Sequence, residues 1–224
     1  MPALLYRRGV LFSVLFVLVL QASSCTGVAT TPKSVLPTTS ELIPPLAPSG
    51  EKTKGCEHVL QVIQALQDYT HGRRTQKVTF EFTDDEINEY LAYSLRIKPR
   101  SGIKGLAVRF FPDNEVSALA TIDFAGVQKW NDWLIPEALR PALLGTQRPV
   151  QVDIKFQATD GFGTFKLKNV SGPGDAVIPK AAMEWIIEAI ALHQPEWYDT
   201  TRDISLPFHL QRIWTSKQSL FGAT

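Results

Sequence analysis

Two stretches with an apolar residue at every second position constrain this chain most. In Glu115–Phe124 and in Val150–Ala158 every second residue is apolar, which is the period of a strand with one buried face. A turn signal adjoins each stretch, Pro112-Asp113-Asn114 before the first and Asp160-Gly161 after the second. The sequence therefore predicts two hairpins of an antiparallel sheet, with partner strands at Ile103–Phe111 and Gly163–Val170. The intervening polar residues, Asp153 among them, are expected to face water.

Helical patterns surround these hairpins. His58–Tyr69 has an apolar stripe with helical spacing. Thr83 and Glu86 form a capping-box pattern that opens a helix through Leu95, so the carboxylates Asp84-Asp85-Glu86 are expected to serve the helix start. A nearly all-apolar helix is predicted from Pro179 to about His193, buried on most sides. Short strands are expected at Gln76–Phe82, Asp203–Phe208 and Leu210–Leu220. Together these elements predict a single α+β domain over residues 55–224.

The N-terminus has the pattern of a signal peptide over residues 1–24. A basic head is followed by the apolar run Gly9–Leu20, which at about 12 residues is too short to span a bilayer. Ala22-Ser23-Ser24-Cys25 resembles the bacterial lipobox, although that pattern prefers Leu where Ala22 stands. Residues 25–54 are rich in Thr, Ser and Pro and are predicted to be a flexible tether. We expect an exported, periplasmic protein tethered to a membrane surface through acylated Cys25.

Two alternatives at the cysteines stay open. If Cys25 is not acylated, it can form a disulfide bond with Cys56 in an oxidising compartment. Otherwise Cys56 is a small buried apolar residue. His58 is only two residues from Cys56, but the sequence offers no third group to orient the histidine, so a catalytic thiol is not expected.

Composition and motifs exclude several classes of function. The formal charge is +1, and no run of Lys or Arg forms a basic surface, which argues against nucleic acid as a partner. The four histidines lack metal-ligand spacing, and no motif for a nucleophile, phosphate or dinucleotide is present, so we expect neither a metal nor a cofactor. A hydrolase without a recognisable motif stays open, with Asp123, Asp153 and Asp160 as the acids that could pair.

The segment Ala125–Gly145, between the hairpins, carries Trp130 and Trp133 three residues apart. One interpretation is a short helix packed on the sheet. The other is an apolar flap at the mouth of a cavity, or a segment that contacts a membrane surface, where Trp is favoured.

The stretch Phe82-Thr83-Asp84-Asp85-Glu86-Ile87-Asn88-Glu89-Tyr90-Leu91 resembles the strand and "EINxYL" helix of YceB-type bacterial lipoproteins. The order of elements over about Val59–Leu220 also resembles the LmeA-type periplasmic proteins. This resemblance implies the tubular lipid-binding fold, in which a long curled antiparallel sheet built from hairpins wraps around one or two apolar helices. It implies no catalytic residue.

We therefore expect a non-catalytic protein that binds a lipid or other apolar small molecule in an internal groove. Its predicted lining is Ala118, Ala120, Ile122, Phe156, Trp185, Ile186 and Ile190, with Trp130 and Trp133 at the entrance. The main alternative is an assembly lipoprotein that holds an envelope protein through an apolar surface. The sequence does not distinguish an open groove from a filled core.

Overall fold

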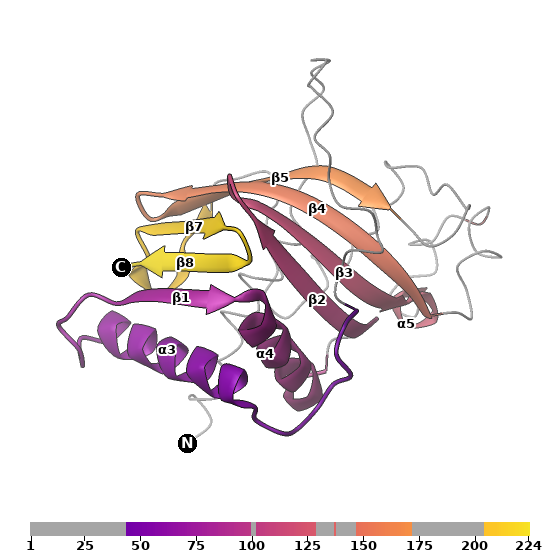
Figure 1. The fold of residues 1–224 in the computed structure, drawn as a ribbon, viewed down its shortest axis with the longest axis horizontal. Coiled ribbons are helices and arrows are strands. Elements are labelled where there is room, and N and C mark those ends of the chain that lie inside the picture. The colour runs from indigo at the N-terminus through magenta and orange to yellow at the C-terminus, as the bar shows by residue number, and fades with distance from the viewer. Residues whose placement is uncertain (1–43, 100–101, 129–136, 138–146, 172–203) are drawn as a thin grey trace, which may run out of the picture.

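The computed structural model describes residues 44–99, 102–128, 137, 147–171 and 204–224. The described residues form an α+β arrangement in which helices accompany two antiparallel sheets (Figure 1). The elements are α3 (Lys54–Thr70), β1 (Thr79–Thr83), α4 (Asp84–Ile97), β2 (Ile103–Phe111), β3 (Glu115–Asp123), α5 (Phe124–Gln128), β4 (Gln147–Thr159), β5 (Phe162–Ser171), β6 (Ile204–Ser205), the short 3-10 helix η3 (Pro207–His209), β7 (Arg212–Ser216) and β8 (Ser219–Ala223). Among the described helices, none is both long and apolar enough to cross a membrane.

The larger sheet has the order β2-β3-β4-β5-β6 and contains both predicted hairpins. Thr159 pairs with Phe162 across a two-residue turn in which Asp160 and Gly161 both have positive φ, the geometry that Asp-Gly supplies in type I′ turns. Asp113 and Asn114 have positive φ in the other hairpin turn. The predicted strand bounds hold to within a few residues because alternation and turn chemistry agree.

One face of this sheet forms the core with α3 and α4. The alternating apolar residues of β2, β3 and β4 are buried there, and the largest fully buried side chains of the core include Phe82, Phe110 and Phe156. The predicted capping box is confirmed, since Thr83 Oγ1 accepts from the Glu86 N–H and the Glu86 carboxylate accepts from the Thr83 N–H.

Helix α4 also satisfies the open edge of β2 (Figure 1). The Asn88 side chain accepts from the Val108 N–H at 2.7 Å and donates to the Val108 carbonyl at 3.1 Å. Asp84 Oδ1 accepts from the Phe110 N–H at 2.8 Å, and the Gln218 N–H donates to the Phe110 carbonyl. Four backbone groups of an edge strand are thus paired, which removes a template for unwanted strand addition.

The smaller sheet has the order β1-β8-β7. The predicted strand Leu210–Leu220 is instead a hairpin, because the chain reverses between Ser216 and Ser219, with Gln218 at φ 61°. The ring of Phe80 lies over Gly222, where a Cβ atom would come within 2.3 Å of it. On the other face Trp214 and Phe221 stack at 5.4 Å.

Residues 44–53, assigned by the sequence to the tether, contact the domain: the Ser49 N–H donates to the Ala92 carbonyl, and Pro45 lies next to Gly105. The predicted helix from Pro179 to His193, the residue Cys25 and most of the segment 125–145 lie outside the described residues. Within that segment, α5 ends at Gln128.

Candidate ligand-binding groove

Helix α3 has an apolar side and a polar side. Its buried residues Cys56, Val59, Ile63 and Leu66 follow the helical repeat and face the core. Thr53 caps the helix, because its hydroxyl accepts from the Cys56 N–H at 3.2 Å. Gln61, Gln64 and Gln67 lie beside this stripe and give that side of the helix polar, uncharged groups.

A network of side chains fixes α3 against the start of α4. Gly55 allows close contact, since a Cβ atom there would meet Glu86 and Glu89. His58 Nδ1 lies 2.7 Å from Glu86 Oε1. Partial burial alone raises the pKa of Glu86, but hydrogen bonds from Thr83 and His58 outweigh it and hold the pKa below its usual range. These polar side chains therefore join the N-terminal ends of α3 and α4.

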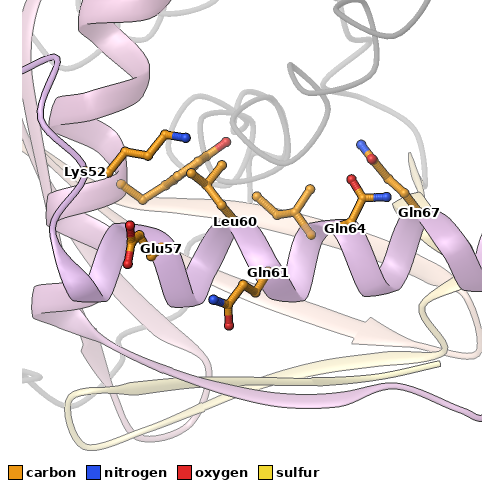
Figure 2. Close-up of a pocket in the computed structure, with 8 residues that line it drawn as sticks. Lys52, Glu57, Leu60, Gln61, Gln64 and Gln67 are labelled. Carbon is orange, nitrogen blue, oxygen red and sulfur yellow. The ribbon is translucent and has the colours of Figure 1, made fainter.

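A groove of about 350 Å³ lies along α3 (Figure 2). Its apolar lining comes from Leu60 and Ile63 of α3 and Tyr90 of α4. Its polar lining comes from Lys52, Glu57, Gln61, Gln64 and Gln67. The volume is at the lower end of the range for ligand pockets, about 300–1,000 Å³.

Gln67 is the least exposed glutamine of this groove. It is 9% exposed, and its amide keeps contact with solvent, because among the described residues the one buried side-chain polar atom without a partner is Asp84 Oδ2. Gln64, one turn earlier, is held in place because its Nε2 donates to Asp68 Oδ1 at 3.0 Å. Asp68 is in turn paired with Arg73. Figure 2 shows Gln64 and Gln67 projecting to the same side of α3.

The catalytic alternatives find little support in the described residues. Cys56 has a free thiol that is fully buried, and burial raises its pKa, which keeps it in the unreactive protonated form. No group of three or more potential metal-ligating side chains is present in the described ranges.

Asp123 and Asp160, two of the three candidate acids of a hydrolase, lie too far apart to act as a catalytic pair. Asp123 ends β3 opposite Gln147, and Asp160 follows the other end of β4. The 13 residues of β4 separate them by about 40 Å at the usual rise per residue.

The prediction that Asp153 faces water is wrong. Asp153 is 2% exposed and accepts hydrogen bonds from Ser117 Oγ, from Gln151 Nε2 at 3.0 Å and from Asn169 Nδ2 at 3.4 Å. Alternation distinguishes the two faces of a strand but does not reveal that polar residues of neighbouring strands satisfy one another in a buried cluster.

The predicted lining residues divide into two groups. Ala118, Ala120, Ile122 and Phe156 are buried in the core, on the face of the large sheet that meets α3 and α4. Trp130, Trp133, Trp185, Ile186 and Ile190 lie outside the described residues. None of the four described ones lines the α3 groove. Sequence reasoning missed it, although glutamines at positions 61, 64 and 67, three residues apart beside an apolar stripe, were a usable signal.

No protein family, no curated protein and no solved structure matches this chain.

Proposed function

We propose that this chain is an exported, membrane-tethered binding protein that holds the apolar part of a small amphipathic ligand and performs no chemistry on it. The observation that carries the proposal is the α3 groove, in which the apolar side chains Leu60 and Ile63 lie beside polar glutamine side chains. Apolar surface together with a few placed polar groups is the usual composition of a ligand site.

The size of the groove supports a single-chain ligand. A volume of about 350 Å³, at the lower end of the range for ligand pockets, suits one short acyl or alkyl chain along α3. Each methylene group removed from water contributes about 0.8 kcal/mol. A chain that lies over Leu60, Ile63 and Tyr90 therefore gains useful affinity without a charged contact.

The proposal keeps two expectations from the sequence. The tether ends at acylated Cys25, which places the domain near a membrane surface. The large sheet is proposed to wrap around the apolar helix predicted at Pro179–His193, as in the tubular lipid-binding fold. An internal groove lined by Ala118, Ala120, Ile122 and Phe156 is then the alternative place for the ligand.

The test uses the full chain with Cys25→Ser, purified without detergent. Native mass spectrometry before and after organic extraction detects a carried ligand, and dodecanol is then titrated by calorimetry. We expect binding, lost in Leu60→Asp and kept in Leu46→Asp, whose side chain is exposed outside the groove. Loss in Ala120→Leu alone would move the ligand to the internal groove. A clean mass with no uptake would refute ligand binding and favour the partner-protein alternative.

The anchor is tested separately in a bacterial host. The wild-type chain is expected in the membrane fraction with the added mass of acyl groups. The Cys25→Ser variant is expected in the soluble envelope fraction. An unchanged mass and distribution would show that Cys25 is not the anchor.

A further inference from the structure

The outer face of the smaller sheet, opposite Phe80, carries an aromatic pair. Trp214 of β7 and Phe221 of β8 lie at paired positions, and their ring centres are 5.4 Å apart in a stacked arrangement. The strands β1, β8 and β7 lie side by side (Figure 1), and none of the residues that they place on this face is buried. A cross-strand pair of this kind stabilises a hairpin, and it also leaves apolar ring surface in contact with water.

Arg212 adds a cation to the aromatic pair. Its side chain is exposed, and its guanidinium carbon lies 4.5 Å from the centre of the Trp214 ring. Within the described ranges Arg212 pairs with no carboxylate. A guanidinium stacked on a ring keeps its N–H donors available, because they lie in the plane of the group. Arg212 can therefore bind an anion while it stays on the ring.

Lys77 extends the cationic end of this face. It is exposed two residues before Thr79, the first residue of β1. The strand pairing continues to Val78, whose backbone forms hydrogen bonds with the residue that follows β8. Because Val78 is buried, alternation places Lys77 on the outer side with Thr79. Thr79 and Arg212 both pair with Ala223, so Lys77 and Arg212 lie at the same end of the sheet.

The charges of the outer face are mainly positive. Lys217, exposed in the turn between β7 and β8, adds a third cation to Lys77 and Arg212. Among the strand residues of this face the one carboxylate is Glu81, which accepts from Ser219 Oγ at 2.9 Å. The formal charge of the whole chain is only +1, so the positive excess is local.

We infer that the outer face of the smaller sheet docks on an anionic phospholipid surface. Its cations match the phosphate groups, and Trp is favoured at the boundary between headgroups and acyl chains. Aromatic rings beside the cations favour a lipid surface over an acidic protein, because the rings gain an apolar boundary to enter. The outer face shares no residue with the lining of the α3 groove. The inference therefore goes beyond the proposed ligand binding and can be tested apart from it.

Vesicle sedimentation tests the docking. The full chain with Cys25→Ser, which removes the predicted acyl anchor, is mixed with vesicles of phosphatidylcholine, with or without phosphatidylglycerol, at low and high salt. One basic residue near an anionic surface strengthens binding about fivefold. We therefore expect the chain to bind the vesicles with phosphatidylglycerol more tightly by about tenfold or more, and high salt to remove this preference.

Charge reversal locates the contact. Arg212→Glu and Lys77→Glu should each weaken binding to the vesicles with phosphatidylglycerol about tenfold. Lys166→Glu is the matched control, because Lys166 is exposed on β5 of the larger sheet and its reversal changes the net charge equally. This variant should stay within about twofold of the parent chain.

Trp214 is tested by fluorescence. Trp214→Phe keeps an aromatic ring against Phe221, and urea unfolding checks that the variant is folded. Vesicles of brominated phosphatidylglycerol quench tryptophans that contact acyl chains, so the quenched fraction of the emission should fall in Trp214→Phe. An unchanged or larger quenched fraction would show that Trp214 stays in water and that the aromatic pair only stabilises the hairpin.

The outcomes separate this inference from the proposed function. If the chain does not sediment with phosphatidylglycerol vesicles at low salt, the docking is refuted, whereas ligand binding is decided by the dodecanol titration. If Lys166→Glu weakens binding as much as Arg212→Glu, net charge causes the attraction and the outer face is not the docking surface.

Discussion

Asp84 makes the stability of this fold depend on pH. The carboxyl group is buried at the first residue of α4, where Oδ1 accepts from the Phe110 N–H. Oδ2 has no hydrogen-bond partner in the described part of the chain and lies 3.8 Å from Arg109 Nε. Burial raises the pKa of Asp84 from 3.8 to about 6, although the Phe110 hydrogen bond and Arg109 oppose the change. The exposed neighbour Asp85 adds a smaller rise.

The sign of the effect follows from the raised pKa. The folded state holds the Asp84 proton more tightly than the unfolded state, so the contribution to stability is complete below pH 3.8 and is lost as the pH rises through about 6. A shift of about two units corresponds to about 3 kcal/mol. Between pH 4.5 and pH 8 the expected loss is about 2 kcal/mol, because the unfolded-state group is mostly ionised at the lower pH.

The assay is urea unfolding of the wild-type chain and of Asp84→Asn at several pH values. Asparagine keeps an oxygen for the Phe110 N–H but cannot ionise. Relative to Asp84→Asn, the wild-type chain should therefore become less stable by about 2 kcal/mol across this range. Comparing the two proteins cancels the pH dependence of the other groups.

Asp85→Asn is the matched control, since Asp85 is exposed in the same helical turn. We expect a small difference from wild type that changes little with pH. If Asp84→Asn also differs from wild type by a constant amount, the buried carboxyl does not titrate as argued and the reasoning is refuted.

Two other predictions concern packing and edge protection. Gly222→Ala is expected to lower the free energy of unfolding by about 1–3 kcal/mol, because its Cβ atom would overlap the Phe80 ring. In a Phe80→Ala background the same change should cost little. An equal cost in both backgrounds would rule out the contact. Asn88→Leu leaves two buried backbone groups of Val108 unpaired, so we expect a loss of about 3 kcal/mol and faster amide exchange at Val108, measured by NMR, whereas unchanged exchange would contradict the edge role.

The hairpins and the capping box were predictable because their causes are local. Asp160-Gly161 fixes a two-residue turn, and alternation on both sides fixes which face is buried. The hairpin of β7 and β8 was missed for the converse reason. Its turn at Lys217-Gln218 contains neither glycine nor proline, so nothing nearby in the sequence indicates that Gln218 adopts positive φ.

Polar residues account for most of what the sequence could not reveal, because their partners are distant in the chain. Asn88 lies in a helix yet bonds the backbone of β2, 20 residues away. Asp153 lies at a position that alternation assigns to water, and its partner Ser117 is on the neighbouring strand. In both cases the buried side chain forms hydrogen bonds within the protein, as buried polar groups usually do.

Gln67 differs from these residues because its amide stays in contact with solvent. It is 9% exposed, against 2% for Asn88 and Asp153, and the one buried side-chain polar atom without a partner in the described residues is Asp84 Oδ2. An amide that reaches water costs the fold little, and it can form hydrogen bonds with a ligand that enters the α3 groove. Ligand binding is therefore proposed from the apolar surface of Leu60 and Ile63 with polar side chains beside it.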